Sequence, residues 1–247
     1  MPKPAEPRQR YTSGMTRQAV FRLQALPLWT GLLPFVVINI AYVVSAAYDQ
    51  IPSCFPYLTG CTTISSAGRY GFSYWFFKAG VLPSAVLLAL FWLMCRQWLD
   101  ELGEDSAAWR KTIGSLGVLA AIFLVLYTVN LGHRGDFYSL MRRFGVTLYF
   151  GFSGLAQIML LARLQRLHRQ GVTEIPADLL RVMLLVLIGL LVIGLASIPI
   201  RFLIVDKKWA RNIVEWNFAL LMISYYVCVW VAWRATGFEP AWRRRSA

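Results

Sequence analysis

The chain has 247 residues, of which 57% are hydrophobic, and its formal net charge is +13. A mean hydropathy of +0.53 excludes an ordinary soluble globular protein. The positive charge does not indicate nucleic-acid binding, because Lys and Arg gather at the ends of apolar stretches. Six such stretches follow one another, and each is long enough to cross a bilayer, which takes roughly 20 mostly apolar residues.

The predicted fold is all-α: a single integral membrane bundle of six transmembrane helices joined by short connections. A basic arm, residues 1–22, precedes the transmembrane domain of residues 23–234, and a basic tail, residues 235–247, follows it. The first apolar stretch is too long for a cleaved signal peptide, so we expect it to be retained as a span. The spans are expected at about residues 26–48, 75–97, 112–132, 144–163, 180–200 and 214–234.

The distribution of basic residues predicts how the bundle is oriented. If the N-terminus is placed inside, sixteen Lys and Arg residues lie on the inner side and nine on the outer side. This bias favours cytoplasmic positions for both termini. We expect an integral membrane protein of the bacterial inner membrane, with a eukaryotic endomembrane as the alternative.

The first outer connection, residues 49–74, contains Cys54 and Cys61. Two cysteines that face an oxidising compartment are expected to form a disulfide bond. A zinc site is not predicted, because no second Cys or His pair lies nearby. The remaining cysteines, Cys95 and Cys228, lie in or beside spans and are predicted to be small buried apolar groups.

Two other segments yield structural predictions. The connection at residues 96–111 alternates acidic and basic side chains, which is typical of a solvated link. The fourth span contains Gly151, Ser153 and Gly154, and small residues within a span predict close packing against a neighbouring helix.

Sequence motifs for known catalytic chemistries are missing from the chain. It has no H-E-x-x-H, no G-x-x-x-x-G-K-[ST], no C-x-x-C and no G-x-S-x-G. His133, Asp136 and Glu215 remain as weak catalytic candidates, because each could act as a general base. No cofactor or metal is predicted, and whether the protein is an enzyme stays open.

Polar residues gather toward the outer ends of the spans, whereas Gln157 is the one that stands out in the inner half. Polar groups are costly inside a membrane and are therefore candidates for function. Arg and Lys would bind a lipid phosphate, and a carboxylate would orient them. The simpler alternative is that each side chain reaches for water independently. The candidate headgroup-binding residues are Arg69, Lys78, Asn130, Arg201, Glu215 and Asn217.

Two segments resemble the Frag1/DRAM/Sfk1 family, which includes Golgi proteins that assist GPI-anchor lipid remodelling. The first is the run at residues 61–80, with its Ser-rich Ile-Ser motif and an aromatic–basic step into the second span. The second is Glu215-Trp216 at the start of the sixth span. Family members often carry a His near the start of the fourth span, and this chain has none at residues 140–145. The resemblance implies lipid handling and adds Ser65, Ser66 and Trp216 to the candidate headgroup-binding residues.

The predicted function is recognition of lipid from the outer leaflet, or assistance in its remodelling. The expected partner is a membrane lipid with an anionic headgroup, with a membrane-protein partner as a further possibility and no nucleic acid. One alternative is a membrane acyltransferase or lipid hydrolase, although no nucleophile–base pair is visible in the sequence. Another is a small-solute transporter or a membrane scaffold, although no internal repeat supports an inverted-repeat transporter.

Overall fold

The computed structural model describes residues 23–172, 174–203 and 208–240, and these ranges contain helices and no strand. Six of the described helices are long and apolar enough to span a membrane, which confirms the predicted helical membrane bundle. They are α2 (Leu26–Ala47), α5 (Gly71–Glu101), α6 (Ala107–Asn130), α7 (Asp136–Arg169), α8 (Ala177–Leu203) and α9 (Lys208–Ala235). Two one-turn helices, α3 (Pro56–Thr59) and α4 (Ile64–Ala67), lie between α2 and α5.

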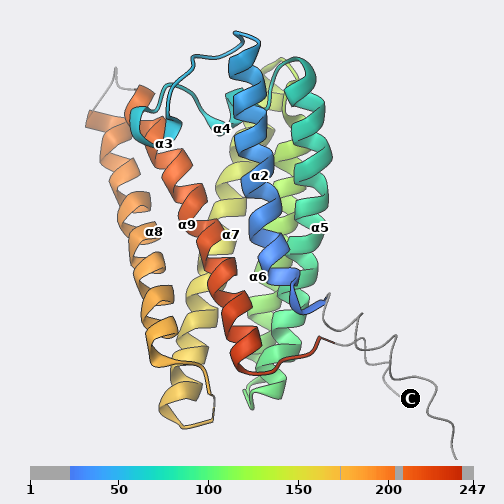
Figure 1. Cartoon of the computed structure of the whole chain (residues 1–247), viewed down its shortest axis with the longest axis vertical. Helices are drawn as coiled ribbons and strands as arrows, with labels where there is room; N and C mark the ends of the chain where they lie inside the picture. Colours follow the sequence, from blue (N-terminus) through green and yellow to red (C-terminus); the bar gives the residue numbers. More distant parts are fainter. Residues whose placement is uncertain (1–22, 173, 204–207, 241–247) are drawn as a thin grey trace, which may run out of the picture.

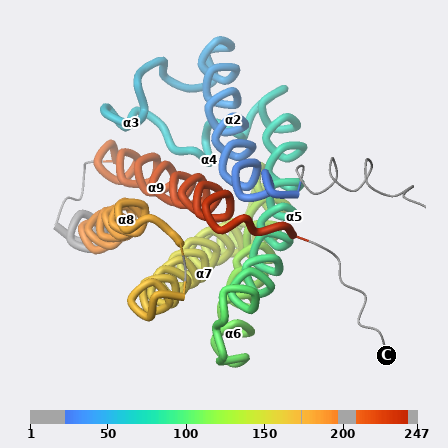
Figure 2. The backbone as a smooth tube through the Cα atoms, turned by 60° about the horizontal axis from the view of Figure 1, so that its bottom comes forward, coloured from blue at the N-terminus to red at the C-terminus, as the bar shows by residue number. Residues whose placement is uncertain are grey.

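The long helices form a closed ring (Figure 2). Each helix packs against the next one in the sequence, and the last helix, α9, packs against the first, α2. One end of the bundle carries α3 and α4, and the described ends of the chain lie at the other (Figure 1). We call these the outer end and the inner end, following the predicted topology. The basic arm and residues 241–247 of the tail lie outside the described residues.

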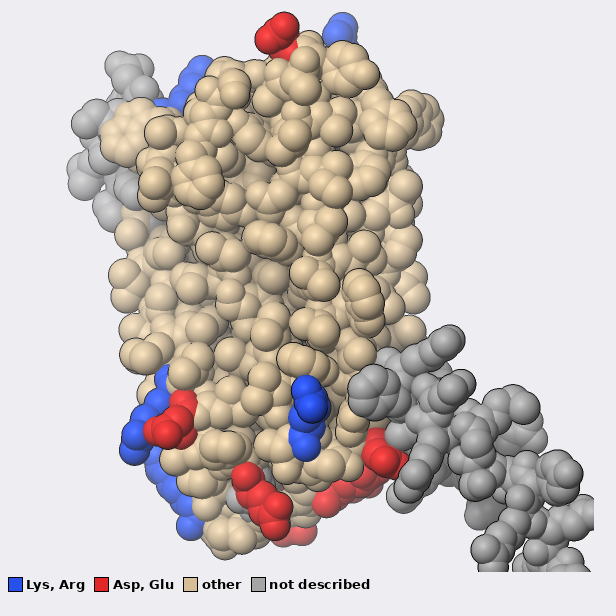
Figure 3. Space-filling model, in the orientation of Figure 1, with Lys and Arg blue, Asp and Glu red and all other residues tan. Residues whose placement is uncertain are grey.

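The surface agrees with a membrane environment. On the face shown in Figure 3, the middle of the bundle is free of charged side chains, which gather at the two ends. Large apolar side chains point outward along α8, among them Leu185, Val192 and Leu195. The helices run past the predicted spans: α5 begins at Gly71 and α7 at Asp136. A helix satisfies its own backbone hydrogen bonds, so it can continue unchanged through the headgroup region.

Aromatic side chains fill the inner half of the ring. Phe91 packs edge-on against Tyr226, with 5.2 Å between ring centroids, and stacks on Trp233 at 5.9 Å. Trp92 is fully buried against Gly117, where a Cβ atom would lie only 1.9 Å from the indole. Glycine at this position therefore lets α6 approach α5 closely. The cavities described below lie elsewhere, toward the outer half of the bundle or between α7 and α8.

In the connection between α5 and α6, Asp100, Glu101 and Asp105 are exposed, as expected for a solvated link, but Glu104 is an exception. Glu104 is only 4% exposed and accepts two hydrogen bonds from Arg163, of 2.6 Å from Nε and 2.8 Å from Nη2. The indole of Trp109 covers the Arg163 guanidinium at 5.1 Å. Burial alone would raise the pKa of Glu104, but its hydrogen bonds to Arg163 and to the Ser106 amide hold that pKa below the usual 4.5.

Gly151 and Gly154 of α7 do not pack closely against a neighbouring helix, which corrects the prediction for these two residues, whereas Ser153 is fully buried. A Cβ atom at Gly151 or Gly154 would meet no other atom within 4 Å. Both glycines line an apolar groove of about 310 Å³ between α7 and α8, together with Leu191 and Gly194. The groove stays open because α8 packs more extensively on α9 than on α7.

Candidate functional site

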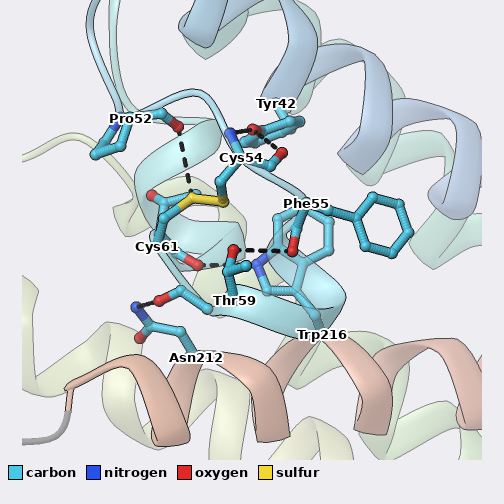
Figure 4. The surroundings of a disulfide bond; sticks show 10 residues. Tyr42, Pro52, Cys54, Phe55, Thr59, Cys61, Asn212 and Trp216 are labelled. Carbon is cyan, nitrogen blue, oxygen red and sulfur yellow. Dashed lines mark hydrogen bonds between the residues drawn. A yellow bond between two sulfur atoms is a disulfide. The ribbon is translucent and has the colours of Figure 1, made fainter.

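A disulfide bond shapes the connection that covers the outer end of the ring. Cys54 and Cys61 are bonded, with their Cα atoms 6.4 Å apart, as the sequence predicted (Figure 4). The loop that they close contains α3. The Tyr42 hydroxyl of α2 donates to the Cys54 carbonyl at 2.6 Å and accepts from the Cys54 amide at 2.7 Å. The disulfide is therefore anchored directly to the first transmembrane helix.

The last helix holds the same connection from the other side. Trp216 is fully buried and packs its indole against the rings of Tyr42 and Tyr57. Three side chains of α9 donate hydrogen bonds to loop carbonyls: Asn212 to Gly60 (2.7 Å), Trp216 to Thr62 (2.9 Å) and Asn217 to Tyr57 (2.8 Å). Trp216 and Asn217 thus use their polar groups inside the protein, although the sequence suggested them for headgroup binding.

Glu215 points into the ring rather than out to water. Its Oε1 accepts a 3.1 Å hydrogen bond from the Ile64 amide, and the Ser65 amide also donates to this carboxylate. The carboxylate therefore caps the start of α4, where exposed amide groups favour a negative charge. The Thr63 hydroxyl completes the cap by accepting a hydrogen bond from the Ser66 amide at 2.9 Å. These contacts hold α4 over the ring interior.

Below α4 lies a cavity of about 70 Å³, which we call the central cavity. Its lining comes from five of the long helices and α4, and it is mostly apolar. Among the described residues that line it, Glu215 is the only charged one. The hydroxyl of Tyr127 lies 2.8 Å from the Ser65 hydroxyl of α4. The aromatic lining residues are Phe77, Tyr127, Tyr149 and Phe150.

A second cavity, of about 510 Å³, opens at the outer end between α4, the start of α5 and the turn from α6 to α7. We call it the outer vestibule. Among the described residues that line it, three arginines face a single carboxylate, that of Asp136. Its lining is Arg69, Tyr70, Gly132, His133, Arg134, Gly135, Asp136, Ser139 and Arg142.

Arg142 and Arg69 hold their positive charges in this vestibule in different ways. Arg142 Nη1 donates to the carbonyls of Asn130, at 3.1 Å, and His133, at 2.8 Å, so its guanidinium is fixed in place. The Arg69 side chain makes no hydrogen bond or ion pair within the described part of the chain. The two guanidinium groups are close enough to repel each other. An anion bound between them would relieve this repulsion.

The vestibule and the central cavity are neighbours. Tyr127, whose hydroxyl is hydrogen-bonded to that of Ser65, lines the central cavity, and Arg142 of the vestibule acts electrostatically on it. The charge of Arg69 acts electrostatically on both Tyr127 and Glu215. A positive vestibule therefore adjoins a cavity that contains one carboxylate.

The other candidate residues do not all meet at this place. Lys78 Nζ donates to the Tyr74 hydroxyl at 2.6 Å and to the Val129 carbonyl at 3.1 Å, and it lines neither cavity. Asn130 donates to Leu126 in its own helix at 2.7 Å and contributes only its carbonyl, which accepts from Arg142. The side chain of Arg201 lies outside the described residues.

The three weak catalytic candidates fall into two groups. His133 and Asp136 share the vestibule, where both are exposed and the His133 ring stacks on Tyr138 at 5.0 Å between centroids. Glu215 lies apart from them in the central cavity. The structure therefore does not bring all three into one cluster.

Sequence reasoning missed four residues that build this region: Tyr127, Arg142, Tyr149 and Asn212. Tyr127 precedes Asn130 by three positions, so the two share a face of α6, and this spacing could have connected them. Arg142 was counted only as one of the outer charges. Nothing in the local sequence links Asn212 to Gly60, because 152 positions separate the two residues.

No protein-family model matches the chain, and no curated protein or solved structure matches it. The resemblance to the Frag1/DRAM/Sfk1 family therefore stays a prediction. The two segments on which it rests do meet in space, since the Ile64 amide bonds to the Glu215 carboxylate across 151 positions of sequence.

Proposed function

We propose that this protein binds the anionic headgroup of an outer-leaflet lipid in the outer vestibule, and that it serves in recognition or remodelling of that lipid. The observation that carries the proposal is the charge of the vestibule, where Arg69, Arg134 and Arg142 face only Asp136 among the described lining residues. A guanidinium group suits phosphate because it can donate two parallel hydrogen bonds.

The position of the vestibule supports a lipid over a soluble anion. The vestibule lies where α6 ends and α7 begins, at the boundary of two predicted spans and hence at the expected depth of headgroups. Phe137 and Phe144, at the start of α7, are 65% and 53% exposed and offer apolar contact for the chains of a lipid. The aromatic packing of the inner half favours binding over the passage of a solute.

A short-chain, water-soluble phosphatidate tests the proposal with the purified protein in detergent. Binding is measured by calorimetry and by the thermal stabilisation that a ligand gives. Arg69→Gln and Arg142→Gln should each weaken binding roughly tenfold or more, because a hydrogen bond to a charged group contributes about 1.5–3 kcal/mol.

Arg143→Gln provides the matched control. Arg143 is the next residue after Arg142, is exposed and does not line the vestibule. We expect this variant to bind phosphatidate like the wild type. Equal affinity in all three variants would show that the vestibule is not the anion site.

A further inference from the structure

We infer that the bound lipid carries a primary ammonium group next to its phosphate, and that this ammonium enters the central cavity and pairs with Glu215. The inference rests on the function proposed above and names the class of lipid that the site takes. It follows from the chemistry of the cavity and its place beside the vestibule.

The central cavity has the chemistry of an ammonium site. Glu215 is its one charge among the described lining residues, and its carboxylate has about four lone-pair positions. The amides of Ile64 and Ser65 use two of them, so acceptor capacity remains for an ammonium group. The rings of Tyr127 and Tyr149 are part of the lining, and aromatic faces attract cations.

Hydrogen bonding selects among ammonium groups. The volume of about 70 Å³ is several times the roughly 10–15 Å³ that one water molecule needs, so the cavity has room for a small polar group. A primary –NH₃⁺ group offers three N–H donors to the remaining acceptor positions of Glu215. A trimethylammonium group has no N–H donor and could not make these hydrogen bonds.

The arrangement of charges matches a headgroup that has both signs. The phosphate would lie between Arg69 and Arg142 in the vestibule, and the ammonium would reach inward to Glu215. Both ends would then be neutralised by one ligand, whereas a plain anion would leave the carboxylate without a mobile counter-charge.

Three short-chain lipids test the inference on the full-length protein in detergent: a phosphatidylethanolamine, a phosphatidylcholine and a phosphatidate. The wild type should bind the ethanolamine lipid about tenfold more tightly than the choline lipid, as one charge-assisted contact implies. Glu215→Gln should abolish this preference, while phosphatidate binding should still depend on Arg69. Glutamine keeps an oxygen that can accept from the Ile64 amide, so α4 stays capped.

Two further variants distinguish the effect of the Glu215 charge from the effects of the cavity volume and of other outer-end carboxylates. Ala219→Leu keeps the carboxylate and fills the cavity, so it should also abolish the ethanolamine preference. Asp49→Asn removes an exposed outer-end carboxylate that lines neither cavity, and it should leave the preference intact. The thermal midpoint of each unliganded variant shows whether the fold is retained.

The possible failures are distinguishable. Equal wild-type affinity for the ethanolamine and choline lipids, with phosphatidate binding still dependent on Arg69, overturns this inference and leaves the proposed function standing. Phosphatidate binding that is independent of Arg69 and Arg142 overturns both. An ethanolamine preference that survives in Glu215→Gln and Ala219→Leu overturns the assignment of the ammonium to the cavity.

Discussion

At the scale of single residues, the inner end of the bundle depends on one buried ion pair. Glu104 and Arg163 join the connection between α5 and α6 to α7, and both are almost completely buried. Loss of either partner would leave the other charge buried and unpaired, which is far more costly than loss of an exposed pair. Arg163 therefore stabilises the fold through its pair with Glu104 and does not serve as a free charge that orients the bundle in the membrane.

Glu104→Gln should lower the free energy of unfolding by about 3 kcal/mol, the lower end of the range for breaking a buried ion pair. Asp100→Asn is the matched control, because Asp100 is 64% exposed and pairs with Arg110 at 3.0 Å. The control should change stability by less than about 1 kcal/mol. Denaturant unfolding in detergent measures both, and similar losses in the two variants would contradict the prediction.

The same pair predicts a pH dependence. The pKa of Glu104 is raised by burial but lowered more by its bonds to Arg163 and Ser106, so it lies below 4.5 in the folded protein. The stabilisation is present above pH 4.5 and is lost as the pH falls through the folded-state pKa. Wild-type stability should therefore drop below pH 4.5 more steeply than that of Glu104→Gln. Parallel curves would argue against the pair.

At the scale of elements, the outer connection is held in place by tertiary contacts. Helices α3 and α4 are single turns, too short to be stable alone. The Cys54–Cys61 bond closes one end of the connection, and α9 binds the carbonyls of the rest. The position of α4 over the central cavity thus depends on these bonds.

The double substitution of Cys54 and Cys61 by serine should lower the free energy of unfolding by about 2–3 kcal/mol, the chain-entropy value for a short closed loop. Reductant should destabilise the wild type and leave the double variant unchanged. Thiol labelling of the folded wild type without reductant should miss both residues, and ready labelling of either would contradict the bond.

The physics of the bilayer determines which features could be predicted from sequence. The spans were predictable because a membrane requires long apolar helices, and the disulfide because two cysteines share one outer connection. The bond from Trp216 to Thr62 was not, since it joins residues 154 positions apart. The prediction that Gly151 packs closely was wrong, because close packing also requires a neighbouring helix against the same face of α7, and a Cβ atom at Gly151 would meet no other atom within 4 Å. The candidate site was predictable in its charge and depth but not in its division into two cavities.

At the scale of the whole molecule, the described chain ends lie together at the inner end of the bundle (Figure 1). Reporter fusions after Ala247 and within residues 102–106 should therefore report the same compartment, and the excess of inner Lys and Arg predicts the cytoplasm. The excess persists without Arg163, which is paired with Glu104. An external signal from either fusion would overturn the topology.

Closure of the ring between α2 and α9 also sets an order for biogenesis. The outer connection is synthesised with the first two spans, yet its partners Asn212, Glu215 and Trp216 belong to the last one. Until that helix enters the bilayer, the amide of Ile64 and the carbonyls of Gly60 and Thr62 must bond to water. A nascent chain that stops before α9 would therefore have an outer connection without its hydrogen-bond partners and a ring of helices that is still open.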